Sequence, residues 1–153
     1  MKTPDAYRPP HDLKKIVEAN AFLRELGVVF RRLDGDGAVF ELDLDNRHLN
    51  AEGRPHGGVY TTILDAASGF ATRFRGADTP LSGTLTLSLT TEFMGVPETK
   101  RLVATGVVVG GGQSIAFTRA KLHDSGGALI ASASGTFKRV FPKRDSEHSG
   151  AER

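Results

Sequence analysis

The sequence predicts one α+β domain in which an antiparallel sheet wraps a single long, buried helix. Residues 58–74 are apolar around nearly the whole helical circumference, which is the pattern of a buried helix. Runs of alternating apolar and polar residues precede and follow this segment, separated by glycine-rich turns, as in antiparallel strands. The chain has 153 residues, 39% of them hydrophobic, which is enough for one core but leaves little for a second.

The N-terminal part predicts a flexible segment followed by a peripheral helix. Residues 1–10 are rich in proline and polar groups, so we expect them to be flexible. From His11 to Leu26 the apolar residues fall near helical spacing. Asp12 is the expected cap and Gly27 the expected end of this helix, which would lie outside the sheet.

The remaining segments predict strands. A β-hairpin is expected where residues 28–33 and 38–44 flank the turn sequence D-G-D-G. After the buried helix, strands are expected at residues 81–93, 101–109, 114–123 and 128–141. In the first of these, the alternation places Leu85, Leu87, Leu89 and Phe93 on one face and Thr86, Ser88, Thr90 and Glu92 on the other. Residues 11–141 thus form the domain, and the charged segment 142–153 is expected to be a disordered tail.

Composition excludes several classes of function. A formal net charge of +2 gives no polybasic signal for nucleic acid or a membrane surface. The absence of cysteine excludes disulfides, a thiolate nucleophile and a cysteine-based zinc site. No segment approaches the roughly 18 uninterrupted apolar residues of a membrane span, and the N-terminus lacks the apolar core of a signal peptide. We therefore expect a soluble, cytoplasmic protein.

The most informative stretch runs from Asn50 to Gly69, where polar residues precede the buried helix and one carboxylate lies within it. Asp65 stands among apolar residues, and burying a carboxylate is costly unless a partner compensates it. This makes Asp65 the first candidate for chemistry. His56 and two glycines are expected at the N-terminal end of this helix.

The motif resembles that of a known enzyme family. It has the pattern Asn-x-x-Gly-x-x-His-Gly-Gly followed by a spaced aspartate, carried by Asn50, Gly53, His56, Gly57, Gly58 and Asp65. This pattern is similar to that of hotdog-fold acyl-CoA thioesterases of the phenylacetate-pathway (PaaI-like) type. Residues from Thr84 and from Gly111 also look like the later strands of that family. The resemblance implies a hotdog fold, with the sheet as the bun and residues 58–74 as the filling, and hydrolysis of an acyl-CoA thioester.

The spacing of the motif bears on how a site could be assembled. The N–H groups of Gly57 and Gly58 are expected among the unpaired donors at the positive end of the helix, where a thioester oxygen could gain charge. Asp65 lies eight residues beyond Gly57, roughly 12 Å along the helix axis. Either the two belong to different sites or a second subunit supplies one of them. The resemblance implies the second arrangement, in a homodimer or a homotetramer built as a dimer of dimers.

The resemblance also implies roles for single residues. Asp65 would act as general base or as nucleophile, and the sequence leaves both open. His56 would orient the thioester or a water, Asn50 would fix the motif loop or the water, and Thr86 aligns with a residue that positions the attacking water in some relatives. The turn carrying Gly111, Gly112, Gln113 and Ser114, together with Lys138, would bind coenzyme A. Gln113 departs from the basic residue that many relatives carry there.

Two other functions compete with hydrolysis. A hotdog dehydratase or hydratase usually pairs its histidine with a differently spaced acid. A non-catalytic, regulatory acyl-CoA-binding hotdog domain would not need both His56 and Asp65. The other histidines, His11, His48, His123 and His148, show no metal-ligand spacing, and no dinucleotide or P-loop fingerprint is present. We therefore expect no metal and no cofactor beyond the coenzyme A of the substrate.

Overall fold

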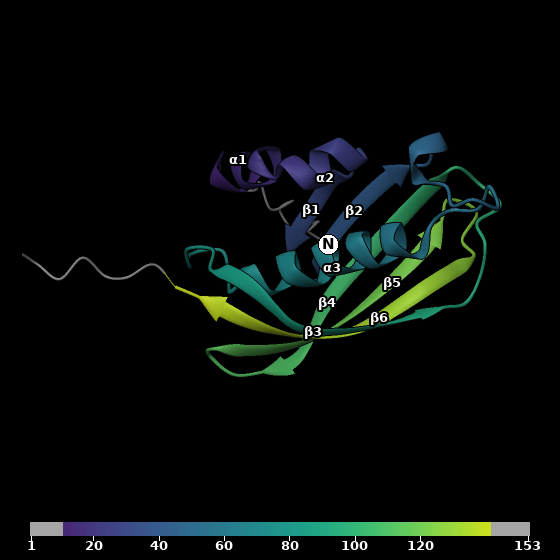
Figure 1. Cartoon of the computed structure of the whole chain (residues 1–153). Helices are drawn as coiled ribbons and strands as arrows, with labels where there is room; N and C mark the ends of the chain where they lie inside the picture. Colours follow the sequence, from purple (N-terminus) through teal and green to yellow (C-terminus); the bar gives the residue numbers. More distant parts are fainter. Residues whose placement is uncertain (1–10, 142–153) are drawn as a thin grey trace, which may run out of the picture.

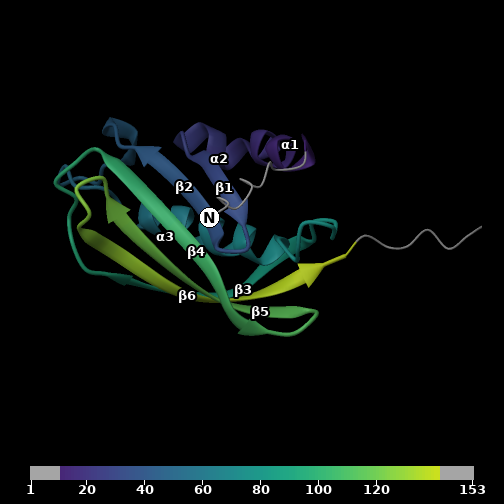
Figure 2. The ribbon, with the colours of Figure 1, turned by 180° about the vertical axis from the view of Figure 1, so that it is seen from behind.

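A computed structural model describes residues 11–141 as one antiparallel six-stranded sheet curved around a central helix (Figure 1). The elements are α1 (His11–Ala19), α2 (Ala21–Leu26), β1 (Val29–Asp34), β2 (Gly37–Asp43), a short 3-10 helix (Asn46–His48), α3 (Gly57–Arg73), β3 (Gly83–Phe93), β4 (Arg101–Gly111), β5 (Ile115–Asp124) and β6 (Leu129–Val140). The strand order is β1-β2-β4-β5-β6-β3, and all neighbours are antiparallel. The view from behind shows the long strands crossing the back of α3 (Figure 2). The predicted α+β architecture is confirmed.

The expected single N-terminal helix is two helices. The chain leaves the helical conformation at Asn20, whose φ and ψ are −77° and 90°, and its side-chain oxygen accepts a hydrogen bond from the Leu23 N–H at 3.2 Å. An asparagine that caps a following turn offers the backbone an alternative to continued helix, and this explains the break. Gly27 ends α2 in the left-handed conformation (φ 77°), as expected. Asp12 lies within α1 and not ahead of it, so its expected place as the cap was wrong.

The central helix is buried as predicted and begins and ends one residue earlier than expected. Ile63, Leu64 and Ala67 have no exposed surface, and the core continues into the strands behind them. At Gly106 of β4 the backbones of sheet and helix almost touch. A Cβ built there would lie 2.4 Å from the Ala67 carbonyl carbon, so only glycine fits. This close approach fixes the depth at which α3 lies in the sheet.

Strand β3 departs from the predicted alternation. Thr86 pairs with Phe137 and Ser88 with Thr136, so Leu87 is an extra residue in a β-bulge. The bulge reverses the phase of the strand: the side chains of Thr84 and Thr86 lie toward α3 before it, and that of Leu89 packs on the core after it. The expectation that four apolar residues of this strand share one face was therefore wrong, and Leu85 and Leu87 are both 55% exposed.

The other predicted strands are confirmed to within two residues at each end, and so is the hairpin of β1 and β2. Phe40 of β2 and Phe137 of β6 are among the largest fully buried side chains. The flexible segment expected at residues 1–10 and the tail expected at 142–153 lie outside the described residues. Within residues 11–141, no helix is both long and apolar enough to cross a membrane.

Candidate active site

The loop before α3 is held by Asn50. The side-chain oxygen of Asn50 accepts hydrogen bonds from the backbone N–H groups of Glu52 and Arg54, both at 3.0 Å. Gly53 has a φ of 72°, which a residue with a side chain rarely adopts, and its N–H donates to the Asn50 carbonyl at 3.0 Å. These bonds agree with the first of the two roles expected for Asn50, the fixing of the motif loop.

His56 is the N-cap of α3. Its Nδ1 accepts a hydrogen bond from the Gly58 N–H at 2.9 Å, which leaves the proton of the neutral ring on Nε2. The expectation that the Gly58 N–H is an unpaired donor was therefore wrong. The N–H of Gly57 has no partner among residues 11–141, so it is the free donor at the positive end of the helix.

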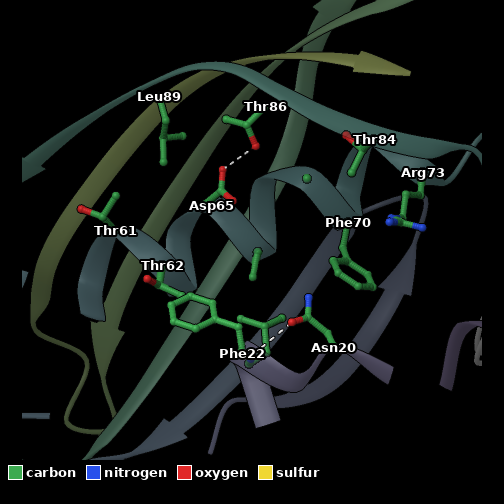
Figure 3. Close-up of a pocket in the computed structure, with 13 residues that line it drawn as sticks. Asn20, Phe22, Thr61, Thr62, Asp65, Phe70, Arg73, Thr84, Thr86 and Leu89 are labelled. Carbon is green, nitrogen blue, oxygen red and sulfur yellow. Dashed lines mark hydrogen bonds between the residues drawn. The ribbon is translucent and has the colours of Figure 1, made fainter. Parts of the chain in front are cut away.

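Asp65 faces the strand at the edge of the sheet. The Thr86 hydroxyl donates a hydrogen bond of 2.9 Å to Asp65 Oδ1, as the dashed line in Figure 3 shows. The Asp65 side chain is half-buried, less than the apolar sequence around it suggested. Burial raises the pKa of its carboxyl above the ordinary value, and the hydrogen bond from Thr86 offsets part of this rise. Its Oδ2 has no partner in the described part of the chain.

Asp65 and Thr86 lie in the wall of a cavity of about 530 Å³ between α2, α3 and β3 (Figure 3). The remaining lining residues are Asn20, Phe22, Leu23, Thr61, Thr62, Ala66, Gly69, Phe70, Arg73, Thr84 and Leu89. This volume falls within the usual range for small-molecule sites. The cavity therefore offers room for a substrate beside a carboxylate with an open oxygen.

Several lining residues were not anticipated from the sequence. Arg73 lies eight residues after Asp65 in α3, so the helical period places both side chains on one side of the helix. This spacing is a signal in the sequence that could have identified Arg73. Asn20 and Phe22 reach the cavity only because the chain breaks between α1 and α2. Thr84 precedes the bulge in β3 and faces α3, where its hydroxyl accepts a hydrogen bond from Thr72 at 3.0 Å.

The chain does not bring His56 and Asp65 into one cavity. His56 and Gly58 line a separate hollow of about 330 Å³, together with residues of α2 and the motif loop. Phe22 and Thr62 border both hollows. Because Gly57 and Asp65 lie eight residues apart on one straight helix, roughly 12 Å separates them along its axis. Within the described chain, the two halves of the motif therefore lie in separate hollows.

The turn expected to contact coenzyme A joins β4 and β5 and lies beside the end of β6. The register pairs Ile115 with Lys138, which brings Lys138 next to the turn residues Gly111, Gly112, Gln113 and Ser114. Arg139, which the sequence did not single out, holds this region together. Its Nε donates to the Thr72 carbonyl at 2.9 Å and its Nη1 to the Gly112 carbonyl, so it links the turn to the end of α3.

The described residues contain no group of three or more histidine, aspartate or glutamate side chains arranged to hold a metal ion. His48, one of the histidines noted in the sequence, is fully buried. Its Nε2 lies 2.7 Å from the Leu26 carbonyl and its Nδ1 accepts from the Asp45 N–H at 2.9 Å. Both ring nitrogens therefore contact backbone groups, and the side chain links the end of α2 to the segment before the motif loop.

Comparison with known proteins gives consistent results. A family model described as the thioesterase superfamily matches residues 52–131. A Pseudomonas aeruginosa protein named "Putative esterase PA0474" is 33% identical over 139 residues, covering 90% of this chain and 97% of that protein. The Escherichia coli PaaI protein from the phenylacetic acid degradation operon superposes with a TM-score of 0.75 at 19% identity, over 84% of this chain and 91% of that one. The Haemophilus influenzae thioesterase HI1161 gives a TM-score of 0.75 at 14% identity, over 88% and 92%.

Proposed function

The chain belongs to the thioesterase superfamily, and from this premise we propose that the thioester it hydrolyses is an acyl-CoA, giving a free acid and coenzyme A. The hotdog fold expected from the sequence is confirmed, and the chain is a thioester hydrolase. One observation carries the proposal for the site. A carboxylate with a raised pKa, Asp65, stands in the wall of a cavity large enough for a substrate, with one oxygen held by Thr86 and the other open.

The complete site is proposed to form between two chains. Strand β3 is at the edge of the sheet and, within residues 11–141, pairs only with β6, so its other side has backbone groups available for a second copy. Its exposed residues include three large apolar side chains, Leu85 and Leu87 at one end and Phe93, 56% exposed, at the other. A Cβ built on Gly57 would lie 3.3 Å from the Phe93 ring, so this ring lies beside the start of α3. Pairing of two β3 strands about a twofold axis would bury this surface and bring the α3 N-terminus of one chain towards Asp65 of the other.

In the proposed reaction, the substrate carbonyl oxygen lies against the free Gly57 N–H of one chain. Asp65 of the partner subunit either removes a proton from a water that attacks the carbonyl carbon, or attacks that carbon itself and forms an anhydride that water then opens. In both routes the carbon–sulfur bond breaks, the thiolate of coenzyme A leaves and takes a proton, and the acid is released. Thr86 holds the carboxylate oriented in either case, and His56 shapes the turn that presents Gly57.

We propose that the coenzyme A part of the bound substrate extends out of the cavity along the turn of Gly111, Gly112, Gln113 and Ser114. Two backbone hydrogen bonds at this turn, from Arg139 to Ser114 and from Gly112 to Ile115, both at 2.8 Å, give it a defined shape. Lys138 alongside would supply positive charge for a phosphate. No cofactor and no metal are part of the proposed mechanism, and the proposed location is the cytoplasm.

A thiol-release assay tests this function. Purified protein is given aryl and alkyl acyl-CoAs with a chromogenic thiol reagent at neutral pH, with and without EDTA. We expect turnover of at least one acyl-CoA that EDTA does not change. Binding of acyl-CoA without thiol release from any of them would instead support a regulatory binding domain. Hydration of an enoyl-CoA without thiol release would support the hydratase alternative.

A further inference from the structure

Arg73 lies at one end of the cavity that contains Asp65. It is in the last turn of α3, eight residues and roughly 12 Å beyond Asp65, on the same side of the helix. In Figure 3, Arg73 and Thr84 stand at one end of the cavity, and Thr61 and Leu89 at the other. The Asp65–Thr86 pair lies between them. An extended ligand reacting at Asp65 would therefore pass Arg73 if it ran towards the end of α3.

The guanidinium of Arg73 lacks the partners that a half-buried cation normally has. Its Nε is fully buried and has no hydrogen-bond acceptor. No carboxylate of the described residues lies within ion-pairing distance of it. The guanidinium lies over the ring of Phe70, whose centroid is 4.9 Å from Cζ. Burial also lowers the pKa of Arg73, so desolvation of the cation is not compensated within the chain.

A second donor faces the same cavity. The side-chain oxygen of Asn20 is occupied by the Leu23 N–H, so its amide nitrogen is the group left to donate, and it has no acceptor in the described part of the chain. The wall from these donors to Asp65 is largely apolar, formed by Phe22, Ala66, Gly69 and Phe70. The cavity thus has the Arg73 guanidinium at one end and the Asp65 carboxylate in its middle, with the donor of Asn20 on the wall formed by α2.

We propose that Arg73, which lines the same cavity as Asn20, binds an anionic oxygen carried by the substrate and thereby determines which thioesters the enzyme prefers. A guanidinium presents several N–H donors in a plane that matches a carboxylate or a phosphate. Two parts of a thioester substrate carry such a group: the far end of a dicarboxylic acyl chain and the phosphates of coenzyme A. This inference rests on the proposed function, because the site it describes is the proposed hydrolytic one.

Four substrates distinguish the two sources. They are the coenzyme A and pantetheine thioesters of a monocarboxylic acid and of a dicarboxylic acid of equal chain length. Each is tested with wild type, Arg73→Met, Arg73→Lys and the control Arg75→Met, which removes an exposed arginine outside the cavity. For the substrates whose anion reaches Arg73, we expect Arg73→Met to raise KM about 10- to 100-fold, as for loss of a hydrogen bond to a charged group. The value of kcat should change little, Arg73→Lys should restore part of the affinity, and Arg75→Met should resemble wild type.

The pattern of the loss identifies the anion. A loss confined to the dicarboxylic thioesters, with either carrier, assigns the acyl carboxylate to Arg73. A loss with both coenzyme A thioesters but neither pantetheine thioester assigns a coenzyme A phosphate. Equal KM values for wild type and Arg73→Met on all four substrates, with thermal melting showing that the variant is folded, would overturn the inference.

A binding measurement separates this inference from the proposed function. Calorimetry with free coenzyme A and with a free dicarboxylate, on wild type and Arg73→Met, requires no turnover. If wild type hydrolyses none of the thioesters, the proposed function fails, while weaker binding of either ligand to Arg73→Met still supports the anion site. Turnover by wild type together with unchanged kinetics and unchanged binding in Arg73→Met leaves the function standing and removes the anion site.

Discussion

The Thr86 hydroxyl donates a hydrogen bond of 2.9 Å to the Asp65 carboxylate, joining the edge strand of the sheet to the middle of the central helix. The bulge at Leu87 follows Thr86 and allows Leu89, beyond it, to pack on the same side of the strand as Thr86. The bond holds one carboxylate oxygen and favours the ionised form, while burial favours the neutral form. The pair therefore sets both the orientation and the charge of the proposed catalytic group.

We expect Asp65→Asn to lower kcat by at least about 10²-fold, the low end for loss of a general base. The amide keeps the shape of the side chain and removes its charge, so KM for acyl-CoA should change little. Steady-state thiol release measures both constants. Asp78→Asn, the same change at an exposed position, is the control and should match wild type. A near-normal kcat in Asp65→Asn would refute the catalytic assignment.

The acid limb of the pH profile should reflect the raised pKa of Asp65. The active form is the carboxylate, so kcat should fall as the pH decreases through this pKa, and the fall should come at a higher pH than for an ordinary aspartate. Thr86→Val removes a bond that stabilises the charged form, so the pKa should rise further and the limb should move to higher pH. Thr90→Val, the same change on the same strand at a threonine outside the cavity, is the control. An unchanged limb in Thr86→Val would show that this bond does not tune the catalytic carboxylate.

Two inactive variants should complement each other if the site is shared between chains. Hybrid dimers of Asp65→Asn and His56→Ala contain one site with an intact Asp65 from one chain and an intact His56 from the other. Random exchange makes about half of the dimers hybrids, so about a quarter of the wild-type sites should be restored. The activity of an equimolar mixture is compared with that of each variant alone. Subunit exchange shown by mass spectrometry without any gain in activity would exclude the shared site.

Gly106→Ala should destabilise the fold by about 2 kcal/mol or more, in the range of overpacked cores. The added Cβ would lie 2.4 Å from backbone atoms of Ala67, and neither backbone can move without shifting the sheet from α3. The midpoint of urea unfolding measures the effect. At Gly35 an added Cβ would meet only the Phe74 ring at 3.9 Å, so Gly35→Ala is the matched control. Equal midpoints would mean that the helix is not held at this depth.

The sequence by itself determined the order of the elements and the chemical character of the site. The apolar circumference of residues 57–73 is a local pattern and is sufficient to predict a buried helix, and the single carboxylate within it identified Asp65. The Asn50 and Gly53 spacing likewise encodes a loop that closes on itself, because the hydrogen bonds made by Asn50 join residues at most four positions apart. Such features depend on neighbours in the chain.

The tertiary structure decided which side chains meet. The bulge in β3 arises from pairing with β6, more than forty residues later, so no pattern within β3 could place Thr86 against Asp65. The break at Asn20 matters for the site because Asn20 and Phe22 become part of the cavity wall. The hydrogen bond from the Gly58 N–H to His56 depends on the geometry of one turn. Periodicity fixes the direction of a side chain relative to its own element, whereas the contact it makes depends on how distant elements pack.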